Sequence, residues 1–308
     1  MDKIKIMLLA GGWSRERDVS LKSGITVYNA LDKTKYEITM FDPGKGLRVL
    51  AEAKDKIDLV FNLLHGKSGE DGSIQGFLNI LGIKFIGSDV LSSAMTFNKR
   101  VTKDIYKSVG LTVCKDITLK QNENFSINEI KENLGPVLIV KPMSEGSSFG
   151  ISICCTNKEL KKGIEKAFQY DNEVIIEEYI EGREVSCCVL GNMDLNVLPL
   201  VEVVPGDQYG FFDYNAKYIK GAIREICPAP LSPHITDKAG LCAKKAHDAL
   251  RCSVWSRTDM IIKEEKIYML ETNTIPGMTE NSLFPLAARK AGISIKELLD
   301  RLILYSLE

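Results

Sequence analysis

The segment from residue 268 to 278 reads YMLETNTIPGM and follows an apolar run, a pattern that predicts a β-strand ending in polar residues. Side chains two positions apart on a strand share a face, so Glu271 and Asn273 would project their oxygens together. The segment from 255 to 262, WSRTDMII, predicts a second apolar strand and carries Asp259. If the two strands are antiparallel neighbours, these three side chains meet at one spot, where their oxygens suit Mg²⁺ or Mn²⁺ beside nucleotide phosphates. A solvated strand end could carry the same residues without any function.

The composition limits the class of protein. The chain has 308 residues, of which 44% are hydrophobic and 26% charged, and its formal net charge is −1. These values are ordinary for a globular protein of two or three domains. They argue against a general nucleic-acid binder, which carries a basic surplus. No apolar stretch approaches the roughly 20 residues that span a bilayer, so we expect no membrane partner either.

The eight cysteines are spread along the chain without any C-x-x-C pair, and two adjacent pairs lie in β-like runs. This pattern is typical of small buried thiols and not of a disulfide framework or a zinc site. The first apolar run is too short for a secretory signal, so we expect a reduced, cytoplasmic protein.

The order of predicted elements indicates a mixed α/β and α+β protein with three domains. Residues 1–95 alternate strands and helices, ending in a short strand at 84–87, which predicts a mostly parallel sheet flanked by helices. Residues 96–182 read as strand, loop, strand, helix and strand, which predicts an antiparallel sheet. Residues 183–308 carry longer strands and a terminal amphipathic helix. Their irregular, aromatic-rich stretch at 205–221 is expected to form a lid, because long irregular segments in compact domains are usually functional or disordered.

A glycine- and serine-rich loop follows an apolar strand at 141–150, KPMSEGSSFG. Its backbone N–H groups and hydroxyls, including those of Ser147 and Ser148, could close over phosphate oxygens. Lys141 at the strand end and Lys99 in a preceding NKR segment add point charges suited to phosphate. A simple hairpin loop is the alternative reading of the same glycines and serines.

Two further segments are ambiguous by themselves. The segment VIIEEYIEGRE, at 174–184, could present backbone groups to adenine and a carboxylate to ribose, or could be a solvated charge run. His65 follows an apolar strand, where ligands bind in parallel sheets, but a buried structural histidine would occupy the same position.

Five motifs occur in order along the chain: GGWSRERDVS at 11–20, HGKSGEDG at 65–72, KPMSEGSSFG at 141–150, FFDYNAKY at 211–218, and RTDM with LETNTIPGMTENSLFP between 257 and 285. With this order and spacing the chain resembles the D-alanine–D-alanine ligases of the ATP-grasp superfamily over nearly its whole length. The resemblance implies an ATP-grasp architecture with ATP held between the sheets of the central and C-terminal domains. It also implies a homodimer.

The resemblance implies roles for the residues that match these motifs. Those that would hold ATP are Lys99, Lys141, Ser148, Glu177, Glu178, Tyr179, Ile180, Glu184, Phe211 and Lys217. Those that would act in catalysis are Glu16, His65, Ser147, Tyr218, Arg257 and Gly277, with Glu16 and His65 beside the first D-alanine. Ser282 and Leu283 would receive the second D-alanine. Two Mg²⁺ or Mn²⁺ ions would be bound by Asp259, Asn273 and a bridging Glu271.

The chain departs from the family pattern at three positions and leaves alternative functions open. Trp13 is bulkier than the usual residue, Asn98 replaces an acidic residue before Lys99, and Thr258 replaces an aliphatic one. A relative that uses D-lactate or D-serine as the second substrate is the near alternative, although Tyr218 goes with the D-alanine product. Another carboxylate–amine ligase, or a nucleotide sensor without catalysis, is the more distant one.

Overall fold

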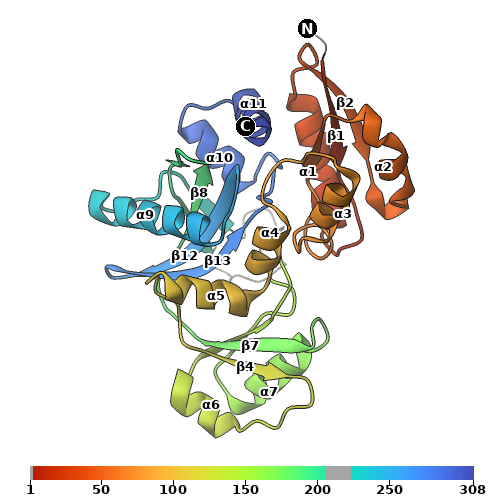
Figure 1. Ribbon diagram of the computed structural model, residues 1–308. Coiled ribbons are helices and arrows are strands. Elements are labelled where there is room, and N and C mark those ends of the chain that lie inside the picture. The colour runs from red at the N-terminus through yellow and green to blue at the C-terminus, as the bar shows by residue number, and fades with distance from the viewer. Residues whose placement is uncertain (1–2, 206–222) are drawn as a thin grey trace.

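The computed structural model describes residues 3–205 and 223–308, and three β-sheets organise this part of the chain (Figure 1). A parallel sheet is formed by the N-terminal region, and two antiparallel sheets are formed by the central and C-terminal regions. The predicted combination of α/β and α+β architecture is therefore confirmed. The predicted domain boundaries after residues 95 and 182 stay a prediction.

The N-terminal sheet has the strand order β2-β1-β3, with all pairs parallel. Residues Ile6 and Leu8 of β1 join one hydrophobic cluster while Met7 and Leu9 join another, so both faces of the sheet are buried, as parallel sheets require. The strand expected at 84–87 forms only an isolated bridge to β3, through Phe85. The elements of this region are β1 (Ile4–Leu9), α1 (Arg17–Ala30), β2 (Tyr36–Phe41), a 3₁₀ turn (Pro43–Lys45), α2 (Arg48–Ala53), a second 3₁₀ turn (Lys54–Lys56), β3 (Leu59–Asn62) and α3 (Ser73–Leu81).

The central region contains an antiparallel sheet of order β4-β7-β5-β6. Helices α6 and α7 pack on one face, where Leu138, Val140 and Ile176 are buried. The other face lines the cavity described below. Helices α4 and α5 connect this region to the N-terminal sheet (Figure 1). The elements are α4 (Val90–Phe97), α5 (Lys99–Ser108), β4 (Asp116–Lys120), α6 (Ile127–Leu134), β5 (Leu138–Pro142), β6 (Ser152–Cys154), α7 (Asn157–Ala167) and β7 (Glu173–Glu178).

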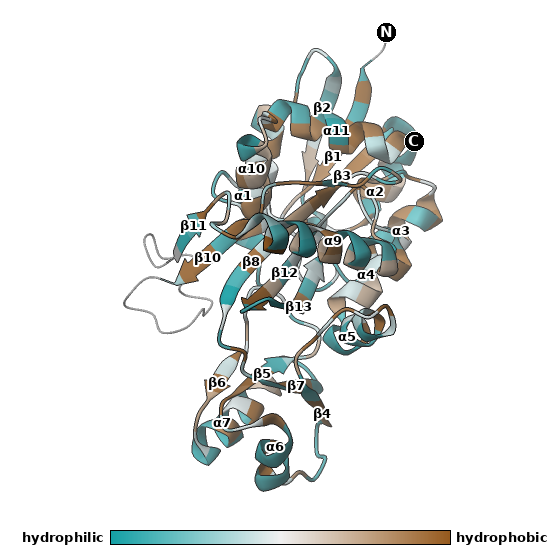
Figure 2. Cartoon of the chain, turned by 90° about the vertical axis from the view of Figure 1, so that its left-hand side faces the viewer, coloured by the Kyte–Doolittle hydropathy of each residue, from teal (hydrophilic) through white to brown (hydrophobic). Residues whose placement is uncertain are grey.

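The C-terminal region contains a six-stranded antiparallel sheet with the path β11-β10-β8-β12-β13, and β9 pairs with β8. Helices α5 and α9 cover one face, burying alternate residues such as Val185, Cys187 and Met260. Figure 2 shows this larger sheet above the smaller central one, with hydrophobic residues in several of its strands. The elements are β8 (Arg183–Leu190), β9 (Asn196–Val197), β10 (Val201–Pro205), β11 (Ile223–Ile226), α9 (Pro233–Ala249), β12 (Trp255–Lys263), β13 (Lys266–Asn273), α10 (Leu283–Lys290) and α11 (Ile295–Leu307).

The terminal helix α11 packs as its apolar spacing predicts, with Leu298, Leu299, Leu302 and Ile303 fully buried. These side chains join the cluster that also contains residues of β1 and α1, so the C-terminus of the chain stabilises the N-terminal sheet. All eight cysteines are free thiols. Within the described residues, none of the helices has the length and apolarity needed to cross a membrane.

Candidate active site

A cavity of about 350 Å³ lies between the free face of the central sheet and the facing side of the C-terminal sheet. Lys99, at the start of α5, also lines it. The central sheet and its loops contribute Ile139, Lys141, Glu145, Gly146, Ser147, Ser148, Ile151, Tyr179 and Ile180. The C-terminal sheet and the link before it contribute Gly182, Arg183, Glu184, Glu202, Val203, Val204, Pro205, Asp259, Ile261, Leu270 and Glu271.

Strands β12 and β13 pair antiparallel, as the sequence predicts, and their register sets Asp259 opposite Glu271 and Arg257 opposite Asn273. Since these positions alternate by two along each strand, all four side chains belong to one face of the sheet. A bulge follows Asp259, between it and Met260. The register therefore brings the predicted oxygen ligands together beside an arginine.

The Asp259 carboxylate is held from two sides. Arg257 donates from Nε at 2.9 Å to Oδ1 and from Nη2 at 2.8 Å to Oδ2, and Ser186 donates from Oγ at 2.6 Å to Oδ1. Burial acts to lower the pKa of Arg257, but the charge of Asp259 outweighs it and the net shift is upward. Nη1 of Arg257 has no hydrogen bond to any described residue, which leaves it available to a ligand.

The Glu271 carboxylate differs from Asp259 in its surroundings. It accepts no hydrogen bond and forms no ion pair within residues 3–205 and 223–308, although it lines the cavity. Asn273 Oδ1 accepts from the backbone N–H of Ile275 at 2.8 Å. Within the same residues, no cluster of three or more His, Cys, Asp or Glu side chains is placed to hold a metal ion. Two carboxylates and one carboxamide fit a cation whose remaining ligands are supplied by phosphate.

Two lysines bring positive charge to the cavity. Lys99 donates from Nζ to the backbone oxygen of Glu145 at 2.6 Å, and Lys141 Nζ lies 2.6 Å from Glu177 Oε2. Burial lowers the pKa of Lys99, although the nearby Glu271 charge acts against the shift. Burial also acts on Lys141, but the Glu177 carboxylate raises the pKa of Lys141 above its ordinary value.

The two adjacent glutamates of β7 have different positions. Glu177 is buried, and its carboxylate is bound by lysines at both oxygens, so it does not line the cavity. Glu178 points to the other side of the strand and accepts from the backbone N–H of Lys115 at 2.8 Å. Tyr179, Ile180 and Glu184 do line the cavity, beside the link between the two sheets.

The serine-rich loop reaches the N-terminal region. Ser147 Oγ donates a hydrogen bond to Glu16 Oε1, and a Cβ at Gly146 would lie 2.7 Å from Glu16 Oε2, so a larger residue at this position would displace the Glu16 carboxylate. Ser147 and Ser148 both have positive φ, 45° and 60°, a left-handed conformation that non-glycine residues adopt at an energetic cost. Such residues are concentrated at functional sites.

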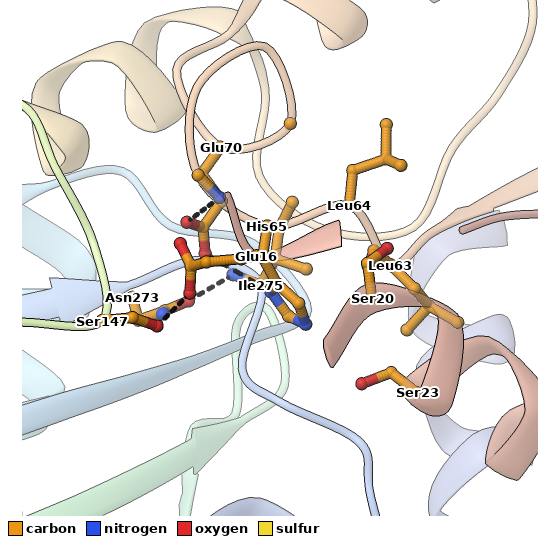
Figure 3. Close-up of polar contacts among 12 residues, drawn as sticks. Glu16, Ser20, Ser23, Leu63, Leu64, His65, Glu70, Ser147, Asn273 and Ile275 are labelled. Carbon is orange, nitrogen blue, oxygen red and sulfur yellow. Dashed lines mark hydrogen bonds and ion pairs between the residues drawn. The ribbon is translucent and has the colours of Figure 1, made fainter. Parts of the chain in front are cut away.

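His65 lies near Glu16 and is buried (Figure 3). Its Nδ1 is 3.8 Å from Glu70 Oε1, and Glu70 Oε2 accepts from the backbone N–H of Gly66 at 2.7 Å. Burial acts to lower the pKa of His65, but Glu70 and, more weakly, Glu16 raise it, and the net shift is upward. Nε2 of His65 has no hydrogen-bond partner within the described chain, so it can bind a ligand.

The segment after β13 places the last predicted residues. Gly277 and Ser282 lie in close contact, because a Cβ added at Gly277 would be only 2.9 Å from Ser282 Oγ. Ser282 Oγ accepts from the backbone N–H of Thr279 at 2.9 Å, and Leu283 begins α10 with its side chain partly buried. The predicted residues Phe211, Lys217 and Tyr218, with the expected lid, lie outside the described residues.

The departures from the family pattern have structural reasons in two cases. Asn98 is the N-cap of α5 and accepts from the backbone N–H of Val101 at 3.1 Å, a role that asparagine fills well. Thr258 Oγ1 lies 2.8 Å from Thr272 Oγ1 in a buried hydroxyl pair. Trp13 is exposed. Nothing in the structure explains it.

Three site residues were not anticipated from the sequence. Ser186 binds Asp259, Glu70 accompanies His65, and the backbone oxygen of Glu145 accepts from Lys99. A signal existed for Ser186, because it is two residues after Glu184 on a strand and therefore shares its face. Glu70 lies inside the HGKSGEDG motif, so the same motif could have indicated it.

Comparison with known proteins covers the whole chain. The family model described as D-ala D-ala ligase N-terminus matches residues 43–88, and the one described as D-ala D-ala ligase C-terminus matches residues 105–304. A D-alanine–D-alanine ligase of Syntrophobacter fumaroxidans is 50% identical over 307 residues, which cover 100% of this chain and 99% of the relative.

Solved structures agree with these matches. D-alanine–D-alanine ligase from Bacillus anthracis superimposes with a TM-score of 0.89 at 38% identity, covering 99% of this chain and 97% of that chain. A structure of the Bacillus anthracis ligase complexed with ATP superimposes with a TM-score of 0.87 at 35% identity and covers 99% of this chain and 97% of that chain. The VanG D-Ala:D-Ser ligase from Enterococcus faecalis superimposes with a TM-score of 0.86 at 34% identity and covers 99% of this chain and 100% of that chain.

Proposed function

The chain belongs to the D-alanine–D-alanine ligase family, and we propose that it joins two D-alanines into D-alanyl-D-alanine, with ATP as the source of the activating phosphoryl group. The dipeptide would serve peptidoglycan synthesis. The observation that carries the proposal is the register of β12 and β13. This register sets Asp259 opposite Glu271 at a cavity that Lys99 and Lys141 also line.

The reaction needs two displacements because a carboxylate is a poor electrophile. In the first, a carboxylate oxygen of one D-alanine attacks the γ-phosphorus, the bond to the bridging oxygen breaks, and ADP leaves. In the second, the amine nitrogen of the other D-alanine attacks the carbonyl carbon of the acyl phosphate. Phosphate leaves with the electron pair of the broken C–O bond, and the amine releases its proton. Both steps develop negative charge, which fixed cations stabilise best where water is excluded.

Two lysines that line the cavity, together with other residues that the family resemblance assigns to the site, suit these needs. Lys99 and Lys141, which line the cavity, would bind phosphate oxygens. The Nη1 of Arg257, which has no hydrogen bond to a described residue, and the backbone N–H of Gly277 would stabilise the charge on the carbonyl oxygen. Glu16, held by Ser147, would receive the ammonium group of the first D-alanine, with His65 beside it. Ser282 and Leu283 would receive the second D-alanine.

The proposal includes two Mg²⁺ or Mn²⁺ ions held by Asp259, Glu271 and Asn273. The fit rests on Glu271, whose carboxylate lines the cavity without a hydrogen-bond partner in the described chain, and a partly buried anion without a partner favours a cation. When bound, the ions would neutralise phosphate charge as Lewis acids. Glu271 would bridge them, and Asp259 would be oriented by Arg257 and Ser186.

The nucleotide would lie along the cavity, with adenine and ribose next to Tyr179, Ile180 and Glu184 and the phosphates next to Ser148. The volume of about 350 Å³ is in the range of small-molecule sites. Phe211 and Lys217 would complete this site from the lid, and Glu177 and Glu178 would support it from β7. A homodimer and a cytoplasmic location, where ATP is available, belong to the same proposal.

The test is release of ADP from ATP with D-alanine as the sole amino acid, with the dipeptide identified by mass spectrometry. We expect release that requires Mg²⁺ or Mn²⁺ and yields one dipeptide per ADP. Release that needs a different amino acid, or that yields no dipeptide, would contradict the proposal.

D-serine is the second candidate for the second substrate, because the D-Ala:D-Ser ligase VanG is a full-length structural neighbour. Adding D-serine or D-lactate to the same assay separates these possibilities. A mixed dipeptide or a depsipeptide formed in preference to D-alanyl-D-alanine would assign the chain to that branch.

A further inference from the structure

A buried lysine outside the predicted site is part of a chain of charges that leads to the cavity. The side chain of Lys103, on α5, is 1% exposed. Its Nζ lies 2.6 Å from Glu177 Oε1, 3.2 Å from Asp116 Oδ1 and 3.2 Å from Cys114 Sγ. A lysine so fully removed from water is unusual unless its charge is paired.

The chain continues through Glu177 to the cavity. The other carboxylate oxygen of Glu177 lies 2.6 Å from Nζ of Lys141, which lines the cavity. Glu177 is therefore bound at both oxygens by lysines from two different elements, α5 and β5. The paired charges lower the pKa of this carboxylate despite its burial, so Glu177 stays ionised.

We propose that Lys103 is a positioning residue for the nucleotide site, which fixes Lys141 through Glu177. A lysine side chain has four rotatable bonds, so a point charge at a defined place needs an anchor. Glu177 is that anchor, and Lys103 prevents its carboxylate from rotating. This inference rests on the proposed function, because it takes Lys141 to bind the phosphates of ATP.

The contacts of Asp116 show why the effect reaches Glu177. Asp116 keeps two other cations if Lys103 is removed: Arg100 Nη1 lies 2.7 Å from Oδ2, and Lys107 Nζ lies 3.3 Å from Oδ1. Glu177 has no such replacement within the described residues, since its only other ion pair is the one with Lys141. Loss of Lys103 would therefore leave a buried carboxylate with one cation, free to draw Lys141 away from the cavity.

Lys107 provides a matched control. It lies one helical turn after Lys103 and also pairs with Asp116, but its side chain is 45% exposed and it does not contact Glu177. Lys103→Met removes one buried positive charge and leaves a side chain of similar length, whereas Lys107→Met makes the same change at the surface of the same helix. Lys103→Arg keeps the charge.

The experiment measures KM for ATP, KM for D-alanine and kcat, together with binding of ADP by calorimetry. For Lys103→Met we expect about a tenfold rise in KM for ATP and in the ADP dissociation constant. A change of this size corresponds to the loss of one charge-assisted hydrogen bond. KM for D-alanine should stay within about twofold of the wild-type value, and all constants measured for Lys107→Met should do the same. Lys103→Arg should recover most of the nucleotide affinity.

A second variant covers the case in which Lys103→Met does not fold. In Lys103→Met/Asp116→Asn one buried cation and one buried anion are removed together, so the net charge of the buried cluster is unchanged while Glu177 still loses Lys103. A folded variant, verified by circular dichroism, that binds ADP as tightly as the wild type would overturn the proposal. Equal rises in KM for ATP and D-alanine would also overturn it, because they would indicate a general structural role.

Failure of the proposed function would be distinguishable from failure of this inference. If the wild type forms no dipeptide from D-alanine, ligation is refuted, but ADP binding still compares Lys103→Met with Lys107→Met. If ligation is found and the two variants bind ADP alike, the inference on Lys103 is wrong.

Discussion

Acidification from pH 7 to pH 5 should destabilise the protein through one buried side chain, His247 on α9. This imidazole is 1% exposed, its Nδ1 lies 2.8 Å from Ser256 Oγ, and its Nε2 has no hydrogen-bond partner among the described residues. Burial lowers the pKa of His247 from 6.5 to about 4, because a charged ring would have no water around it. The folded protein therefore keeps this ring neutral.

The size of the effect follows from the difference between the folded and unfolded pKa values. Between pH 6.5 and pH 4 the unfolded chain binds a proton that the folded protein does not, so stability is lost as the pH falls through this range. At pH 5 the loss relative to pH 7 is about 2 kcal/mol, and below pH 4 it approaches about 3 kcal/mol. This is a large share of the ~5–15 kcal/mol that stabilises a typical domain.

The assay is urea unfolding at pH 7 and pH 5, followed by fluorescence of Trp255, which is buried next to Ser256. His247→Gln keeps a hydrogen-bonding group but does not titrate. Its free energy of unfolding should therefore fall by about 2 kcal/mol less between pH 7 and pH 5 than that of the wild type. Groups such as His65, whose raised pKa has the opposite effect, are present in both proteins and cancel in the comparison. The exposed His234, changed to Gln, is the control.

Equal pH dependence of the wild type and His247→Gln would refute the reasoning. It would mean that the ring is hydrated, or already charged, in the folded protein. A variant that is less stable at pH 7 does not affect the test, because the quantity compared is the change between the two pH values.

Three further predictions concern the site. Glu271→Gln should lower kcat by about a thousandfold while the protein stays folded, because the carboxylate proposed to bridge the cations is lost; near-normal turnover would refute the metal assignment. Tyr218→Phe should relax the specificity for the second substrate, because the family resemblance gives Tyr218 a catalytic role and associates it with the D-alanine product; unchanged kinetics at both D-alanine sites would count against that role. Arg15→Gln should raise KM for D-alanine about threefold, because the Arg15 guanidinium lies 4.7 Å from the Tyr170 ring centroid beside the serine-rich loop. Lys33→Gln, which removes a cation at the same distance from another ring, is the control and should leave KM unchanged.

Several parts of the site could be predicted from the sequence because they depend on local periodicity. Alternation along two apolar strands predicted that Asp259 and Glu271 would share a face, and the observed register confirms the pairing. The expected strand at 84–87 is reduced to a bridge, because the chain turns away after two backbone hydrogen bonds to Val60. Propensity gives the type of an element more reliably than its extent.

The functions of neighbouring residues could not be separated from the sequence. Glu177 and Glu178 read alike in a charged strand end, but one is buried between two lysines and the other binds the backbone of Lys115. Period-two alternation predicts that they face opposite sides, but only the packing of the sheet shows which side is the cavity.

The sequence by itself determined most of the strand and helix order, the oxygen-bearing side chains two positions apart, and the lysine at the end of a strand. These features depend on the geometry of a few consecutive residues. Only the tertiary structure decided which distant groups meet: Ser147 with Glu16 across 131 positions, and Lys103 with Glu177 across 74. The physical reason is that a pairing between buried charges is fixed by how sheets and helices pack, and no local pattern of residues records that packing.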